Sequence, residues 1–258
     1  MASTNPYPFP RERKLILSLL LILAAASWAL LIWQSVAMNS QAMGMGLTMG
    51  MSAVLFIAIW AVMMIAMMFP TAAPMILMFT TVYAGKRQQG RAFVPTWVFV
   101  GAYLLVWTLF GVLAYPLALL AESLAGQSMW LMTNAPRIGG ALLVVAGLYQ
   151  LSPLKHLCLA KCRTPLQFIL GSWRDGYGGA FRMGFVHGAY CLGCCWFLFV
   201  LLFPLGIMNI AVMALLTALI FAEKSVPLGR QISQITGVAL ISYGVLVVLV
   251  PAALPTGM

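Results

Sequence analysis

Long apolar stretches alternate with short polar segments along most of this chain. A helix needs roughly 20 apolar residues to cross the hydrocarbon of a bilayer, and several stretches reach that length. The pattern predicts about seven membrane-spanning helices, with six as the alternative because the sixth stretch is short. The expected spans cover residues 15–33, 52–83, 93–120, 138–152, 183–203, 207–222 and 231–250. The sequence therefore predicts an all-α, polytopic transmembrane bundle, one domain over residues 1–258.

Two of the expected spans carry a special local feature. Pro70 and Pro74 lie inside the second span and predict a break there, because proline removes a helical hydrogen bond. The first span follows basic residues, as the apolar region of a signal peptide does. It stays apolar well past Ser27, however, which makes it longer than a usual signal region. We therefore expect it to be kept as a membrane span.

The composition excludes a soluble globule. The chain is 63% hydrophobic and 7% charged, whereas a soluble domain carries about 25% charged residues. Its net charge of +10 would suggest nucleic acid in a soluble protein. In a membrane protein the same excess follows from the preference for Lys and Arg on the cytoplasmic side. We therefore expect the lipid bilayer as partner and no nucleic acid.

The basic residues also fix the expected orientation. We let consecutive spans cross the membrane in opposite directions and count the basic residues on each side. One side then holds only Arg137, and the other holds thirteen: Arg11, Arg13, Lys14, Lys86, Arg87, Arg91, Lys155, Lys161, Arg163, Arg174, Arg182, Lys224 and Arg230. The basic side should be cytoplasmic. This predicts a multi-pass protein of the cytoplasmic membrane, with the tail 1–14 inside and residues 251–258 outside.

Two predicted connections have unusual compositions. The outer loop 34–51 has no charge and holds Met38, Met43, Met45, Met49 and Met51, where a soft ion would first arrive from outside. The inner loop 153–182 is basic and contains His156, Cys158 and Cys162. It could be a cytoplasmic metal site or a basic collar on anionic lipid. Its cations should lower the pKa of the two thiols.

The fifth span carries the most specific chemistry. His187, Cys191, Cys194 and Cys195 are spaced so that they fall on one helical face. Thiolates and imidazoles bind Cu(I), Zn(II) or iron–sulfur centres, although buried cysteine also serves as a small apolar residue. One helix cannot easily surround a metal. We therefore expect ligands from other spans, brought close by the glycines of this span: Gly184, Gly188 and Gly193.

Further candidate ligands lie on the second and sixth spans. Met64, Met67 and Met68 could offer thioether sulfur, which suits Cu(I) and needs no deprotonation. Adaptable packing is the alternative for these methionines. At the inner end of the sixth span, Glu223 is expected to pair with Lys224, Arg182 or Arg174. A role for Glu223 and Lys224 in proton or metal transfer is the alternative.

Four stretches resemble a known bacterial family. They are Trp60–Pro70, Cys162–Pro165, Gly184–Trp196, and Pro204–Asn209 followed by Glu223 and Lys224. On these motifs the chain resembles the family of predicted metal-binding integral membrane proteins, domain of unknown function 2182. The resemblance implies a small helical membrane protein that binds a metal, and it supplies no reaction.

Three functions stay open on the sequence. The favoured one is binding of a soft metal, copper first and zinc as the alternative, for transport or delivery to a membrane metalloenzyme. The others are a thiol-redox carrier using Cys191, Cys194 and Cys195, and an accessory subunit of a larger membrane complex with structural cysteines. The chain contains no P-loop for ATP, and the pattern favours a protein that is not an enzyme.

Overall fold

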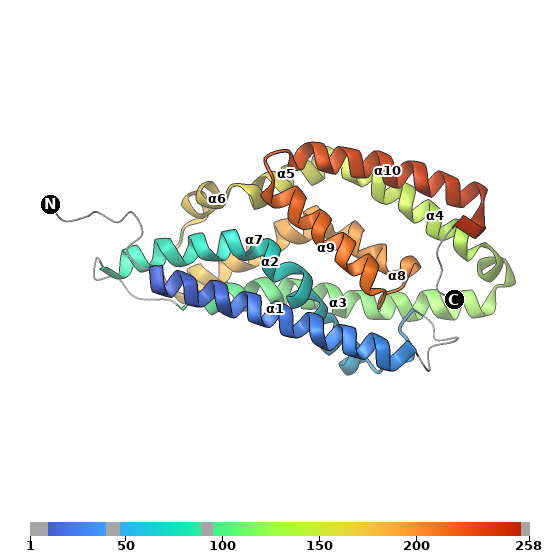
Figure 1. The fold of residues 1–258 in the computed structure, drawn as a ribbon, viewed down its shortest axis with the longest axis horizontal. Helices are drawn as coiled ribbons and strands as arrows, with labels where there is room; N and C mark the ends of the chain where they lie inside the picture. The colour runs from blue at the N-terminus through green and yellow to red at the C-terminus, as the bar shows by residue number, and fades with distance from the viewer. Residues whose placement is uncertain (1–9, 40–46, 89–94, 254–258) are drawn as a thin grey trace.

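A computed structural model describes residues 10–39, 47–88 and 95–253, which are helical without any strand. Figure 1 shows the helices packed as a bundle. Their bounds are α1 Pro10–Asn39, α2 Ala53–Gln88, α3 Thr96–Gln127, α4 Met129–Leu151, α5 Pro153–Arg163, α6 Pro165–Ser172, α7 Gly176–Val200, α8 Leu202–Leu205, α9 Ile210–Ser225, α10 Gly229–Leu249 and the short 3₁₀ helix Pro251–Ala253. The all-α prediction is confirmed.

Six of the described helices are long and apolar enough to cross a membrane: α1, α2, α3, α4, α7 continued through α8, and α10. The remaining expected span, 207–222, is α9, whose 16 residues fall short of the roughly 20 that a full crossing needs. The structure thus agrees with the six-span alternative. Large apolar side chains such as Leu15 and Leu249 are exposed on these helices, as expected where lipid is the solvent.

The helices run alternately through the bundle, which gives it two distinct ends. Helices α1, α3, α7 and α10 begin at one end, where α2, α4 and α9 finish and α5 and α6 lie (Figure 1). We name this the basic end, because it carries Arg11, Arg13, Lys14, Lys155, Lys161, Arg163, Arg174, Arg182, Lys224 and Arg230. These ten basic residues thus gather at one end of the bundle, and which side of a membrane that end faces stays a prediction.

Glycine lets α7 and α3 pack backbone to backbone, as the sequence predicts. A Cβ built at Gly184 would clash with the carbonyl oxygen of Phe99, and one at Gly188 would lie 2.9 Å from Val106. Helices α4 and α10 use the same device, since a Cβ at Gly140 would lie 2.9 Å from the carbonyl oxygen of Gly244. Small residues at such contacts let membrane helices approach closely.

The predicted break at Pro70 and Pro74 is wrong, because α2 continues through both prolines. Proline lacks an N–H, so Pro70 leaves the carbonyl of Ala66 without its helical donor. The indole Nε1 of Trp28 on α1 donates to this carbonyl at 3.0 Å. A neighbouring helix thus replaces the missing hydrogen bond, which is how membrane helices tolerate proline.

Two segments expected as loops are helical. The inner segment 153–182 holds α5, α6 and the start of α7, and α3 and α4 extend into the expected outer connection until only Ser128 separates them. Ser152 and Ser128 cap α5 and α4 by accepting from Lys155 N and Leu131 N. A cap followed by proline, as at Ser152-Pro153, is a helix-start signal. Met43, Met45 and Arg91 lie outside the described residues.

Candidate metal centre

Helix α7 places all four of its predicted ligands inside the bundle. His187 is 3% exposed, and Cys191, Cys194 and Cys195 are at most 1% exposed. They occupy one stripe because their spacing follows the helical repeat. Any ligand role for this stripe stays a prediction, but its four members do share a buried environment.

A fourth buried thiol comes from α5. The Sγ of Cys162 lies 4.0 Å from the Sγ of Cys194, which in turn lies 3.2 Å from the Sγ of Cys195. The approach of α5 to α7 depends on Gly193, where a Cβ would lie 2.9 Å from the Cys158 Sγ. Cys162 therefore belongs with the α7 thiols rather than with a separate site. Cys158 is only half-buried, and all five cysteines are free.

Cys191 is held by a cation and a phenol. The Lys224 ammonium on α9 donates to the Cys191 Sγ at 3.0 Å, and the Tyr103 hydroxyl on α3 forms a hydrogen bond with the same sulfur at 3.1 Å. The Lys224 contact is the stronger kind, because its donor is charged, whereas in the Tyr103 contact either group can be the donor. Lys224 therefore contacts a candidate ligand directly, a role that its neighbour Glu223 does not share.

His187 is enclosed by aromatic rings. Its imidazole stacks on Tyr103 and Phe99, at centroid distances of 5.5 and 5.9 Å, and meets Phe168 edge-on. Its Nδ1 is buried without a hydrogen-bond partner. An unpaired buried polar atom is uncommon and calls for a reason. Tyr103 contacts both His187 and Cys191, so this histidine lies beside the thiols.

The expected partners of Glu223 were wrong. Its carboxylate pairs with Lys155 of α5 at 2.7 Å and accepts from Gln150 Nε2 of α4 at 3.1 Å. Lys155 is 0% and Glu223 1% exposed. A buried charge requires such a partner, and Lys155 is the cation that the α5 helix turns inward. The ion pair joins α5 to α9, the helices that carry Cys162 and Lys224.

The expectation that nearby cations lower the thiol pKa on α5 fails for Cys158. Burial raises the pKa of Cys158, because a thiolate is poorly solvated there. Burial also lowers the pKa of His156, and the charges of Arg230 and Lys155 add to that shift. His156 Nδ1 is buried without a partner. The lowered pKa keeps the His156 imidazole neutral, which is the form that binds metals, so a metal role for His156 and Cys158 stays a prediction.

The three candidate methionines of α2 are fully buried. Met64, Met67 and Met68 are each 0% exposed, within the same core as the thiols. The Thr71 hydroxyl lies 3.9 Å from the Met68 sulfur. Their place inside the bundle is compatible with both packing and soft-metal binding, so their ligand role stays a prediction.

The arrangement suits an ion of low coordination number. In the part of the chain that the structure describes, no three His, Cys, Asp or Glu side chains surround a common point as a metal site would need. Structural zinc takes four ligands, and zinc stays the alternative to copper. Two metal–sulfur bonds of about 2.3 Å each would span about 4.6 Å end to end. The 4.0 Å separation of Cys162 and Cys194 is shorter than that span, so an ion bound to both sulfurs would have a bent S–metal–S angle of about 120°, which leaves room for a third ligand.

Comparison with known families decides the broad class. A family model described as copper chaperone matches residues 57–247, a range that includes α7, α5, α9 and most of α2. The chain belongs to this copper chaperone family. No curated protein and no solved structure matches the chain.

Family membership confirms a copper-related function for this chain. It also agrees with the metal-related family predicted from the four sequence motifs, while the name domain of unknown function 2182 stays a prediction. Tyr103, whose hydroxyl meets Cys191, is not among the residues that the sequence predicts for the site. Only tertiary contact between α3 and α7 brings that tyrosine to the thiol. No motif marks it.

Proposed function

We propose that this protein binds one Cu(I) ion between Cys162 and Cys194, inside a bundle in the cytoplasmic membrane, and delivers it to a membrane copper enzyme. The observation that carries the proposal is the 4.0 Å separation of two buried free thiols from different helices. Thiolates select Cu(I) among biological metals. Binding releases the two thiol protons and leaves a copper–dithiolate unit of charge −1.

Lys224 supports this charge balance. A negative unit is unfavourable in a low-dielectric interior unless a cation lies close to it. The Lys224 ammonium lies 3.0 Å from the Cys191 Sγ. Cys191 lies about one helical turn before Cys194 in α7. With Cys191 kept as a neutral thiol, one ammonium beside one copper–dithiolate unit gives a neutral site. Cys191 and Cys195 then serve as exchange ligands, through which the ion can move to an incoming donor.

The decisive experiment measures copper retained by anaerobically purified full-length protein after exposure to a competing Cu(I) chelator. Wild type should keep about one ion per chain, as expected for a thiolate site, and Cys162→Ser or Cys194→Ser should lose it. Cys158→Ser is the matched control, because this half-buried cysteine lies outside the proposed pair. The proposal is contradicted if wild type retains no copper, or if Cys162→Ser retains as much copper as wild type.

The accessory-subunit and thiol-redox alternatives give different results in the same preparation. Purely structural cysteines would leave the protein without chelator-resistant copper. A redox carrier would form a disulfide among Cys191, Cys194 and Cys195 on mild oxidation, detected by intact-mass measurement after alkylation. The copper proposal expects bound Cu(I) to protect these thiols from both oxidation and alkylation.

A further inference from the structure

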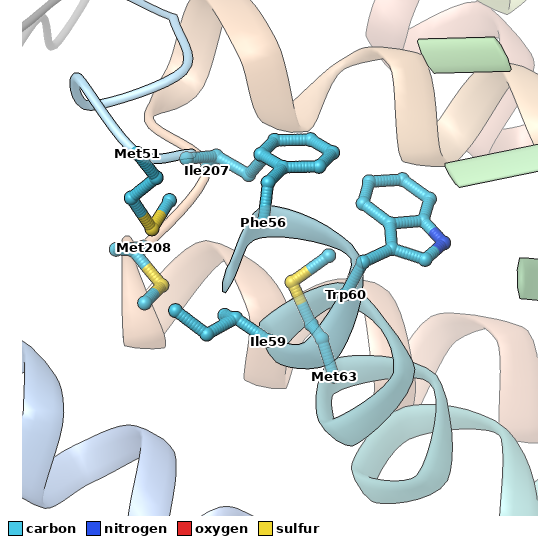
Figure 2. Close-up of a pocket in the computed structure, with 7 residues that line it drawn as sticks. All are labelled: Met51, Phe56, Ile59, Trp60, Met63, Ile207 and Met208. Atoms are coloured by element: carbon cyan, nitrogen blue, oxygen red, sulfur yellow. The ribbon is translucent and has the colours of Figure 1, made fainter. Parts of the chain in front are cut away.

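A second set of sulfur atoms lies far from the thiols, at the end of the bundle opposite the basic end. Met51, Met63 and Met208 line a small cavity together with Trp60 and Phe56 (Figure 2). Its volume is about 10 Å³, room for about one water-sized sphere. A cavity of that size fits a single ion and excludes an organic ligand.

The three methionines come from separate parts of the chain. Met51 directly precedes α2, Met63 lies in α2, and Met208 lies in the turn between α8 and α9. Met63 is 1% exposed, whereas Met51 and Met208 are half-buried. In Figure 2 the side chains of Met51 and Met208 extend toward each other, with Met63 deeper in the bundle. The tertiary fold, not one helical stripe, therefore gathers them.

The backbone around Met51 is fixed from α3. The Tyr115 hydroxyl donates to the Met51 carbonyl at 3.0 Å, and the Thr48 hydroxyl donates to the Glu122 carboxylate at 3.1 Å. Between these two anchors Met49 has a φ of 53°, a left-handed conformation that is uncommon for residues with a side chain. These contacts hold Met51 over the cavity before any ligand arrives.

Packing alone does not account for this arrangement. Methionine is flexible and normally fills irregular gaps in a core. Here three of the seven residues that line a gap are methionines, beside Phe56, Ile59, Trp60 and Ile207, and the gap stays open. Thioether sulfur is a soft donor that binds Cu(I) without losing a proton, whereas Mg²⁺, Ca²⁺ and Zn²⁺ require oxygen, nitrogen or thiolate ligands. The Trp60 ring at the cavity wall can add cation–π attraction.

An aromatic layer separates this cavity from the thiols. The Trp60 ring lies 6.4 Å from the Phe199 ring, which lies 4.8 Å from the Trp107 ring. Phe199 and Cys195 are both on α7, one helical turn apart. The two sulfur sets are therefore distinct sites on the two sides of one aromatic layer.

We infer that Met51, Met63 and Met208 form a second Cu(I) site, a thioether site that holds the ion more weakly than the thiols do. The inference rests on the proposed function only for the identity of the ion. Because the sequence places this end of the bundle outside, the thioether site is where the ion meets the protein from that side. Sites without a deprotonated ligand bind in acid as well as at neutral pH.

The test uses Ag(I), a soft ion that resists oxidation, titrated at pH 5 into the full chain with all five cysteines changed to serine. This protein should bind about one Ag(I) per chain through its thioethers. Adding Met51→Leu and Met208→Leu should weaken binding at least tenfold. Met213→Leu is the matched control, since Met213 is buried but does not line the cavity.

The result that overturns the inference is a folded serine variant, by circular dichroism, that binds no Ag(I) or binds it equally well after the Met51→Leu and Met208→Leu changes. Should the serine variant not fold, the same methionine changes are made in wild type. Total bound Ag(I) should then fall by about one ion per chain, while chelator-resistant copper stays unchanged. If wild type and the methionine variant bind the same total amount of Ag(I), the inference is overturned. Loss of chelator-resistant copper in the cysteine variants reports only on the thiol site.

Discussion

Lys224 on α9 places its ammonium nitrogen 3.0 Å from the Cys191 sulfur on α7. The ammonium and this free, fully buried thiol form a hydrogen bond to a charged group, which is the stronger kind. The contact joins α9 to α7, and the ammonium is the positive charge that the proposed copper–dithiolate unit would need.

Removal of this cation should weaken copper binding. Lys224→Met should lower Cu(I) affinity by about 10- to 100-fold, because a hydrogen bond to a charged group contributes about 1.5–3 kcal/mol. Lys224→Arg should retain most of the affinity, since the charge is kept. Competition with a colorimetric Cu(I) chelator measures both. Lys161→Met, at an exposed lysine of α5, is the control, and an equal effect there would refute the role of Lys224.

The Lys155–Glu223 pair should matter more for stability than for chemistry. Lys155→Met or Glu223→Gln alone should lower the free energy of unfolding by about 3–5 kcal/mol, because each leaves a buried charge unpaired. The double variant should be much less destabilised, since neither charge remains. Thermal unfolding in detergent, monitored by circular dichroism, gives the order of stability of the single and double variants. If the double variant is the least stable, the pair does not act as described.

The proline of α2 offers a double-mutant cycle. Trp28→Phe should destabilise the protein by about 1 kcal/mol, because the Ala66 carbonyl loses its donor. In a Pro70→Ala background the helix regains an N–H for that carbonyl, so Trp28→Phe should cost much less. Unfolding midpoints of the four proteins measure the coupling. Equal costs in both backgrounds would show that Trp28 does not compensate for Pro70.

Gly193 should control how closely α5 approaches α7. Gly193→Ala would place a Cβ 2.9 Å from the Cys158 Sγ, and such overpacking costs about 1–3 kcal/mol. It should also reduce retained copper by moving Cys162 away from Cys194. Cys158→Ala should relieve both effects in the double variant. Gly178→Ala, where a Cβ meets nothing, serves as the control on the same helix.

The pKa of Cys158 gives a pH-dependent prediction. Because burial raises it, a variant with Cys158 as its only cysteine should react slowly with iodoacetamide at neutral pH. Its rate should rise with pH to a midpoint above that of an ordinary thiol, about 8.5. The denatured protein should return to the ordinary midpoint. A midpoint lower in the folded protein would instead support activation by the basic residues of α5.

The sequence predicts the helical class and the stripe on α7 well, because both follow from periodicity along one helix. It does not predict partners across helices. The pairing of Glu223 with Lys155 joins residues 68 positions apart, and which lysine turns inward depends on how α5 packs. The same holds for Cys162, which local sequence groups with Cys158, whereas the fold brings it to Cys194.

Two predictions about where helices end differ from the structure, and each overlooked one feature of the chain. The break expected at Pro70 ignored a donor from another helix, Trp28, which no local pattern indicates. The loop expected at 153–182 ignored the Ser152-Pro153 and Thr164-Pro165 pairs, which start α5 and α6. Those pairs were readable, since proline is favoured in the first turn of a helix.

X-ray absorption at the copper edge, on anaerobic Cu(I)-loaded protein washed with chelator, tests the central claim most directly. The account predicts a Cu(I) with two or three neighbours, all of them sulfur, at a distance comparable to the roughly 2.3 Å of zinc–thiolate bonds. The signal should vanish in Cys162→Ser and persist in Cys158→Ser. A site with nitrogen or oxygen neighbours, or one that Cys162→Ser leaves intact, would contradict it.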